Sequence, residues 1–247
     1  MSLGIGRLGR ELLGAVTPPV IARAVRAVRG RYFSPPSLPQ RPLAELFPGI
    51  EKTRIALPGL SLEVGPGMLP LRELAVLAAI CRYCAPRVIF EIGTFRGAST
   101  LVMGLNSEAG TRIYTLDLPP GEPTRFPLDI GSIAGTPYRI GERYLGTEVE
   151  PRIQQLHGDS AVFDFSPFAG TVDLFFVDGN HAYENARSDS FQAFRSLRPG
   201  GVIVWDDYHP QYGPGVMRAL HEMQNRQIYG IAGTRLAVLA DAEVSRE

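Results

Sequence analysis

The stretch from Val172 to Pro210 constrains the fold more than any other part of the chain, because it has the pattern of a strand, a helix and a second strand. Residues 172–177 form a short apolar run, which is typical of a strand buried on both faces of a parallel sheet. Helical spacing follows over residues 183–197, and a second strand is predicted over residues 202–205. The predicted apolar face of the helix comprises Phe191, Phe194 and Leu197.

Both predicted strands end in acidic residues. Asp178 follows the first strand, with His181 three residues later, and Asp206 and Asp207 follow the second. A right-handed crossover brings the carboxyl ends of parallel strands to one edge of the sheet, where ligands bind in open α/β folds. Three carboxylates at one edge would repel each other, so we expect a bound cation or a shared proton there. The sequence therefore predicts a functional site at this edge.

The remaining chain alternates between strand and helix patterns from Arg87 onward. This alternation predicts an α/β fold, a doubly wound and mostly parallel sheet of seven strands with helices on both faces. The link GIAGTR before the last strand suits a hairpin, so that strand is expected to be antiparallel. The other predicted strands are 87–92, 112–116, 153–157, 228–231 and 236–239, and the other predicted helices are 71–84, 99–106 and 216–226.

The N-terminal part of the chain has a different composition, so we divide the chain into a helical arm with linker, residues 1–60, and a main domain, residues 61–247. Residues 1–40 contain six arginines and one acidic residue, interleaved with aliphatic side chains. This amphipathic pattern is typical of a helical extension that packs on its own domain or on a partner subunit. It also fits a helix lying on an anionic membrane surface.

Composition limits the classes of function. The formal net charge is zero, which gives no reason to expect nucleic-acid binding. No apolar run reaches the roughly 18 residues of a membrane span, and no signal peptide is recognised, so a cytoplasmic location is expected. The two cysteines, Cys81 and Cys84, end a predicted helix, where the helix dipole disfavours a thiolate. We interpret them as core residues.

A glycine-containing turn, EIGTFRG at residues 91–97, joins the first confident strand to its helix. Gly93 and Gly97 permit a tight turn and close approach of a ligand, and Asp117 ends the next strand, as an acid that binds ribose hydroxyls would. The spacing differs from the G-x-G-x-x-G fingerprint, so a cofactor without pyrophosphate fits better. Any Rossmann-like nucleotide site, or a purely structural turn, would give the same local pattern.

Five segments together are more specific than the turn alone. EIGTFRGAST, YTLDL, HGDS, FVDGNHAYE and LRPGGVIVWDDY, in this order, resemble the class I S-adenosylmethionine-dependent methyltransferases, and especially the metal-dependent sugar and macrolide O-methyltransferases. The resemblance covers roughly residues 67–240. It implies S-adenosylmethionine as cofactor and a small-molecule hydroxyl, on a sugar or glycosylated metabolite, as methyl acceptor. Independently of the resemblance, residues 119–138 are expected to form a long loop over the same edge, and loops of this length are usually lids, binding loops or disordered.

The resemblance also assigns roles to individual residues. It implies a metal site at Asp178, Asp206 and Asp207, for which oxygen ligands favour Mg²⁺, and catalytic roles for His181, as general base, and Asp178. The alternatives are that Asp178 caps a helix, that Asp206 and Asp207 are solvated, and that His181 only contacts a carboxylate. Metal-independent transfer and a non-catalytic cofactor-binding module also stay open. The implied cofactor-binding residues are Glu91, Gly93, Thr94, Gly97, Asp117, Asp159, Ser160 and Asp178.

Overall fold

The computed structural model describes residues 37–58, 67–129, 137–223 and 226–240. The chain divides into two units, residues 1–36 and 37–247, and every described residue belongs to the second. The predicted basic helices therefore lie outside the described residues. The predicted division after residue 60 stays a prediction, and residues 37–52 contribute a strand and buried side chains to the sheet domain.

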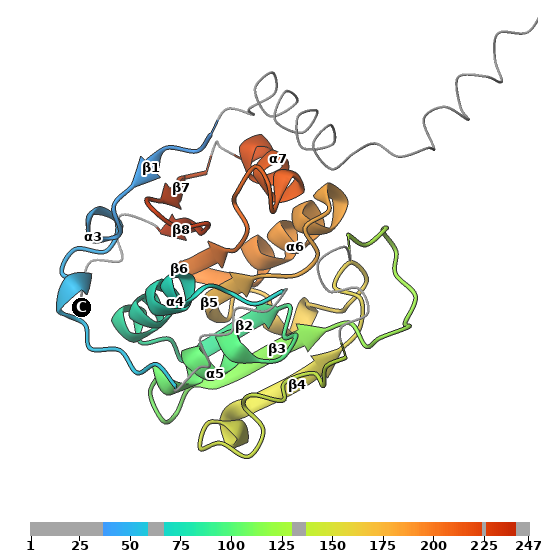
Figure 1. Ribbon diagram of the computed structural model, residues 1–247, viewed down its shortest axis with the longest axis horizontal. Helices are drawn as coiled ribbons and strands as arrows, with labels where there is room; N and C mark the ends of the chain where they lie inside the picture. The colour runs from blue at the N-terminus through green and yellow to red at the C-terminus, as the bar shows by residue number, and fades with distance from the viewer. Residues whose placement is uncertain (1–36, 59–66, 130–136, 224–225, 241–247) are drawn as a thin grey trace, which may run out of the picture. The chain divides into compact units, whose positions relative to one another are not determined.

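The described residues form a mixed α/β fold around an eight-stranded sheet (Figure 1). The strand order is β1-β7-β8-β6-β5-β2-β3-β4. Every neighbouring pair is parallel except the two pairs that involve β8, which confirms the predicted antiparallel last strand. The strands are β1 Gln40–Arg41, β2 Val88–Ile92, β3 Arg112–Asp117, β4 Ile153–His157, β5 Val172–Val177, β6 Leu197–Trp205, β7 Ile228–Ile231 and β8 Ala237–Ala240.

Helices cover both faces of the sheet, as the doubly wound prediction requires (Figure 1). α4 and α5 pack on one face and α6 and α7 on the other. The helices are α3 Leu43–Leu46, α4 Leu71–Cys84, α5 Ala98–Leu105, α6 Tyr183–Ser196 and α7 Pro214–Glu222, with short 3₁₀ turns at η1 Ile50–Lys52, η2 Glu150–Arg152 and η3 Ser166–Phe168.

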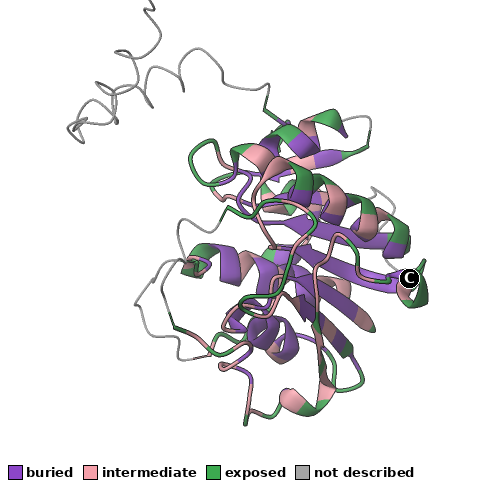
Figure 2. Cartoon of the chain, turned by 90° about the vertical axis from the view of Figure 1, so that its right-hand side faces the viewer, coloured by how far each residue is buried: buried purple, intermediate pink, exposed green. Residues whose placement is uncertain are grey.

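The alternation of side chains along the central strands explains why two separate cores form. In β5, Phe175 lies in the core under α6 and α7, whereas Leu174 and Phe176 lie in the core under α4 and α5. Successive residues of a strand point to opposite faces, so a strand covered on both sides is apolar along most of its length. Figure 2 shows the resulting buried central sheet between helices whose outer sides are exposed.

The predicted number of strands was one too few. β1 adds an eighth strand at the edge, with Gln40 opposite Gly230 and Arg41 opposite Ile231 of β7. β1 has only two residues, and both are exposed and polar, so it carries no apolar pattern that a sequence reading could detect.

The predicted apolar face of α6 was also partly wrong. Phe191 is 43% exposed, and the Arg187 guanidinium lies over its ring at 4.9 Å. Small side chains face the sheet instead, and Ser190 accepts a hydrogen bond from the Trp205 indole N–H at 3.0 Å. β6 begins at Leu197 rather than residue 202, since Leu197 already pairs with Val172 of β5, and the Arg198 side chain pairs with Asp173.

Other predictions about the chain outside the site are supported. Cys81 and Cys84 are free thiols, and Cys81 donates a hydrogen bond to the Met103 carbonyl at 3.3 Å. Burial raises the pKa of both thiols, that of Cys84 to about 12, so neither is a reactive thiolate.

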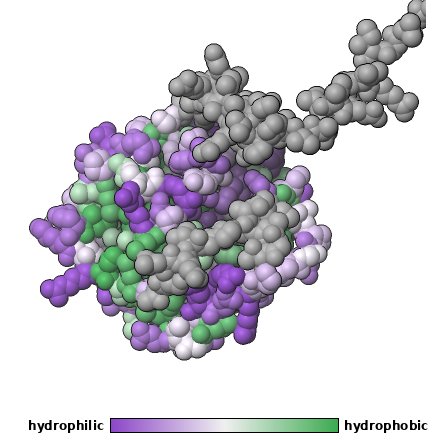
Figure 3. Space-filling model, in the orientation of Figure 1, coloured by the Kyte–Doolittle hydropathy of each residue, from purple (hydrophilic) through white to green (hydrophobic). Residues whose placement is uncertain are grey.

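No helix in the described part of the chain is both long and apolar enough to cross a membrane. The face drawn in Figure 3 mixes hydrophilic and hydrophobic residues.

Candidate active site

The site lies at the carboxyl edge of the sheet, where the ladder of backbone hydrogen bonds continues past the ends of the strands. The Gly93 N–H donates to the Leu116 carbonyl and the Asp178 N–H to the Ile92 carbonyl, both at 2.8 Å. The Asp206 N–H donates to the Val177 carbonyl at 3.0 Å. These bonds fix the first residue after each strand, so the side chains that follow meet at one edge as predicted.

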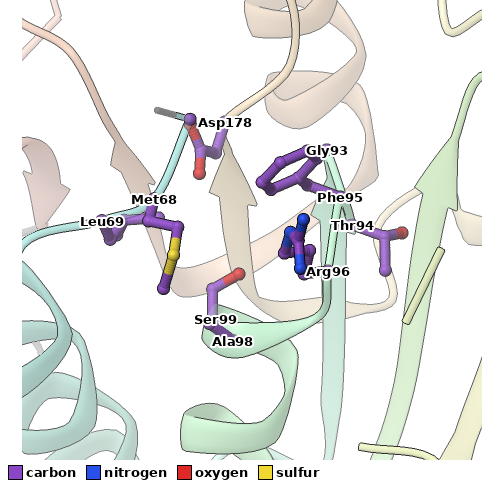
Figure 4. Close-up of a pocket in the computed structure, with 10 residues that line it drawn as sticks. Met68, Leu69, Gly93, Thr94, Phe95, Arg96, Ala98, Ser99 and Asp178 are labelled. Carbon is purple, nitrogen blue, oxygen red and sulfur yellow. The ribbon is translucent and has the colours of Figure 1, made fainter. Parts of the chain in front are cut away.

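A pocket opens between the turn after β2 and the segment that leads into α4 (Figure 4). Met68 lies on one side, facing Arg96 and Ser99, and Asp178 lies at its edge. The side chain of Thr94 points away from Met68. The lining residues are Gly67, Met68, Leu69, Gly93, Thr94, Phe95, Arg96, Ala98, Ser99 and Asp178.

The two glycines of the turn are required by contacts within the protein. Gly93 has φ +99°, and a Cβ there would lie 1.9 Å from the Asp178 carbonyl oxygen. Gly97 has φ +83°, and a Cβ there would lie 2.7 Å from the Tyr144 ring. Both glycines thus form the predicted tight turn and let Asp178 and Tyr144 pack against it, while close approach of a ligand to the turn stays a prediction.

Asp117 is held rigidly at the end of β3. Its Oδ2 accepts the Phe95 N–H at 2.5 Å and its Oδ1 accepts the Leu118 N–H at 2.8 Å. Burial raises the pKa of Asp117 to about 6, while the two backbone N–H groups oppose this shift. Phe95 itself has φ +47°, a strained conformation for a side chain with a Cβ. The carboxylate is thus fixed beside the turn, with acceptor capacity left for a ligand.

Glu91 and Thr94 lie beneath the turn in a buried hydrogen-bond network. Glu91 is fully buried, and its carboxylate accepts hydrogen bonds from Ser99, Thr100 and Thr115 at 2.5 to 2.6 Å. Burial raises the pKa of Glu91 to about 7. Thr94 shares a 2.6 Å hydrogen bond with Thr115. Both residues therefore anchor the turn and the start of α5 from below.

The predicted adenine-flanking residues lie after β4 and meet both the long loop and α6. Asp159 accepts the Ala161 N–H at 2.9 Å and the Arg125 N–H at 2.7 Å. Ser160 hydrogen-bonds the buried Asp189, whose pKa is raised to about 7 chiefly by burial. The described part of the loop therefore lies at the carboxyl edge as predicted.

His181 lies between two of the predicted carboxylates. Its Nδ1 is 3.1 Å from Asp207 Oδ2, and its Nε2 is 4.0 Å from Asp178 Oδ1. The backbone around it is tightly packed, because Asp207 has φ +53° and a Cβ on Gly213 would lie 2.0 Å from the Asp207 carbonyl oxygen. The imidazole is thus held by Asp207 through one nitrogen, while the other faces Asp178 at the pocket.

Two charged residues of this cluster were missed by sequence reasoning. Arg235 lies 3.0 Å from Asp207 and 3.6 Å from Asp206, and Glu73 of α4 lies 3.9 Å from the same guanidinium. The register of β8 could have located Arg235, because Ala237 pairs with Trp205 in an antiparallel ladder. The residue two positions before Ala237, which is Arg235, must therefore lie beside the acids that follow Trp205.

The acidic side chains are strongly perturbed by burial and by one another. Burial, followed by the charges of Asp206 and Asp207, raises the pKa of Asp178 well above its ordinary value. Burial and the charge of Asp207 raise the pKa of Asp206 to about 7, although Arg235 opposes this shift. Among the described residues, no group of three or more His, Cys, Asp or Glu side chains is arranged to hold a metal ion.

Comparison with known proteins identifies similar domains and relatives. A family model described as a methyltransferase domain matches residues 90–208, which are 119 of the 247 residues. Uncharacterized protein R132 of Acanthamoeba polyphaga mimivirus is 27% identical over 140 residues, 54% of this chain and 57% of that protein. Mouse catechol O-methyltransferase domain-containing protein 1 is 26% identical over 140 residues, 57% of this chain and 49% of that protein. The chain thus spans about half the length of the curated relatives it matches.

A solved structure shows the same fold. The O-methyltransferase from Bacillus cereus, solved in complex with SAH (S-adenosylhomocysteine), covers 88% of this chain and 97% of its own, with a TM-score of 0.52 and 16% identity. Residues 90–208 therefore match a methyltransferase domain, and the chain has the fold of a class I methyltransferase. The predicted resemblance to the class I methyltransferases is confirmed by this domain match and by the fold.

Proposed function

We propose that this protein transfers a methyl group from S-adenosylmethionine to a hydroxyl group of a small molecule. The observation that carries the proposal is that the pocket at the β2 turn adjoins a histidine held by a carboxylate. Asp178 lines that pocket and lies 4.0 Å from His181 Nε2, while Asp207 lies 3.1 Å from His181 Nδ1. A base and its orienting carboxylate beside a cofactor pocket are what hydroxyl methylation requires.

The residues around the pocket fit S-adenosylmethionine, whose sulfonium supplies the methyl group when it is bound. Asp117, fixed by two backbone N–H groups, would hold the ribose hydroxyls. Asp159 and Ser160 would flank the adenine. Arg143 would hold the carboxylate of the methionine portion, because its Nε is buried without a hydrogen-bond partner and its guanidinium contacts Met68 at the pocket.

The chain's own contribution to the chemistry is proton removal and alignment. His181 Nε2 would accept the proton of the acceptor hydroxyl while the oxygen forms its bond to the methyl carbon and the carbon–sulfur bond breaks. Asp207 fixes the imidazole ring through Nδ1. Nε2 lies on the side of the ring that faces Asp178 and the pocket. Positioned general bases contribute about 10²–10⁴-fold, and alignment of the two reactants contributes about 7–11 kcal/mol.

The finer predictions concern the acceptor, the metal and the surroundings. Tyr212 is 54% exposed and lies 4.8 Å from the His209 ring, a surface on which a sugar or aromatic acceptor can stack. The Mg²⁺ predicted at Asp178, Asp206 and Asp207 does not enter this mechanism, because those side chains do not form a metal-binding group. A cytoplasmic location and contact of the basic arm with a subunit or membrane stay expectations from the sequence.

The test combines calorimetric binding of SAH with transfer of labelled methyl from S-adenosylmethionine to a panel of small hydroxyl compounds. We expect the wild type to bind SAH and methylate at least one acceptor. His181→Asn should keep SAH binding and lose transfer by about 100-fold or more, whereas the control His221→Asn, on α7, should keep both.

Each failure has a separate meaning. Absence of SAH binding would reject the cofactor. Binding with no methylated acceptor would favour the non-catalytic module. Unchanged transfer by His181→Asn would reject His181 as the base.

A further inference from the structure

A single arginine lies within the acidic cluster where the sequence predicted a metal ion. The Arg235 guanidinium is 3.0 Å from Asp207 Oδ1 and 3.6 Å from Asp206 Oδ2 through its two terminal nitrogens. Its Nε lies 3.9 Å from Glu73 Oε1. The arginine side chain is only 19% exposed, and the three acidic side chains are at most 9% exposed. A cation with a permanent charge therefore already bridges the carboxylates of this cluster.

The backbone holds this arginine in place independently of its charge. The Tyr208 N–H donates to the Arg235 carbonyl at 2.7 Å, and the Arg235 N–H donates to Glu73 Oε1 at 3.2 Å. The ring of Tyr212 covers the guanidinium from a further side, with 4.9 Å between the guanidinium carbon and the ring centroid. Arg235 is thus fixed from α4, through Glu73, and from the segment after Asp207, through Tyr208 and Tyr212.

On the basis of the proposed function, we infer that Arg235 takes the place of a divalent cation, so that methyl transfer by this protein needs no metal. The guanidinium presents two terminal nitrogens to two carboxylates, as a bridging cation would. Its positive charge lies beside two of the three predicted ligands, Asp206 and Asp207, and would repel a metal ion entering between them. The described residues accordingly contain no metal-binding group.

The same contact gives Arg235 a positioning role. Asp207 uses Oδ1 toward Arg235 and Oδ2 toward His181, so the guanidinium holds the carboxylate that orients the imidazole. Arg235 is therefore a positioning residue that acts through Asp207. A divalent ion at this place would likewise put positive charge beside Asp207.

The experiment measures cation binding without methyl donor or acceptor, so it stands apart from the test of the proposed function. Mn²⁺ is titrated into wild type, Arg235→Gln and Arg198→Gln while free Mn²⁺ is followed by electron paramagnetic resonance. Thermal unfolding is recorded with Mg²⁺ and with EDTA. Arg198 is the matched control, because it pairs with the buried Asp173 away from the acidic cluster.

We expect the wild type and Arg198→Gln to bind no Mn²⁺ at millimolar concentration and to unfold at the same temperature with Mg²⁺ and EDTA. Arg235→Gln should unfold at a lower temperature, gain Mn²⁺ affinity by at least about tenfold and be restabilised by Mg²⁺. Merely structural damage would lower the unfolding temperature without this rescue. Stoichiometric Mn²⁺ binding by the wild type, or no cation response in Arg235→Gln, would overturn the inference.

A second variant covers the case in which Arg235→Gln does not fold. Arg235→Lys keeps the positive charge, so it should fold and show no response to Mg²⁺. If Arg235→Lys instead binds Mn²⁺ or needs Mg²⁺ for stability, the fixed-cation role is wrong.

Discussion

The contact between Gly93 and Asp178 gives a quantitative prediction, because it joins the cofactor turn to the catalytic edge. A Cβ at Gly93 would lie 1.9 Å from the Asp178 carbonyl oxygen, and the residue has φ +99°. The left-handed backbone costs a residue with a Cβ about 1–2 kcal/mol. Overpacking against backbone adds about 1–3 kcal/mol. Gly93→Ala should therefore lower the free energy of unfolding by roughly 2–5 kcal/mol.

Two other glycines separate these contributions. Gly121 has φ +86° with no atom near the position of a Cβ, so Gly121→Ala should cost only the backbone share, about 1–2 kcal/mol. Gly110 has open space and no positive φ, so Gly110→Ala should stay within about 1 kcal/mol of wild type. Urea unfolding of the three variants measures each value, provided that the slope with denaturant is unchanged.

The same series tests the link to the pocket. Gly93→Ala must displace Asp178 and should weaken SAH binding, whereas Gly121→Ala should not. If Gly93→Ala and Gly121→Ala cost the same free energy and bind SAH equally, the contact between the turn and Asp178 is not tight. The reasoning that couples the cofactor turn to the catalytic edge would then be wrong.

Two further substitutions test the buried acids. Burial raises the pKa of Glu91 from 4.5 to about 7, so folding favours its protonated form and stability is lost as pH rises through this range. Each unit of difference between the two pKa values corresponds to about 1.4 kcal/mol of folding stability. Glu91→Gln should therefore have the same free energy of unfolding as wild type near pH 4.5, and one higher by on the order of 3 kcal/mol above about pH 8. Urea unfolding at both pH values checks this, and an equal difference at both would contradict it. Asp117→Asn should weaken SAH binding by about 10- to 100-fold in calorimetry. The control is Asp173→Asn, which also loses a carboxylate bound to two backbone N–H groups but at the opposite edge of the sheet, and which should not weaken SAH binding. Equal losses of binding in the two variants would refute a ribose-binding role for Asp117.

Much of the fold was predictable because the central strands are buried runs that end in turn residues. β5 is apolar and buried along nearly its whole length, and the acids that follow β5 and β6 had to meet once both strands were parallel. The antiparallel direction of β8 followed from the short link before it. β1 was not predictable, because Gln40 pairs with Gly230 far along the chain and nothing local marks it as a strand.

The candidate site was predictable to the same extent and for the same reason. Asp178, His181 and Asp207 follow strand ends, and the structure brings them together. Arg235 and Glu73 come from a hairpin and from a helix, and each looks like an ordinary surface charge in the sequence. Only the insertion of β8 between β6 and β7 places Arg235 among the acids, which changes the expected source of positive charge from a metal ion to a side chain.

The central claim is that the pocket beside the β2 turn holds the methyl donor with its sulfur toward His181. A crystal structure of the protein with SAH tests this most directly. We predict the ribose hydroxyls on Asp117 and the sulfur on the side of the pocket where Asp178 and His181 lie. SAH bound elsewhere, or bound with its sulfur directed away from His181, would contradict the account.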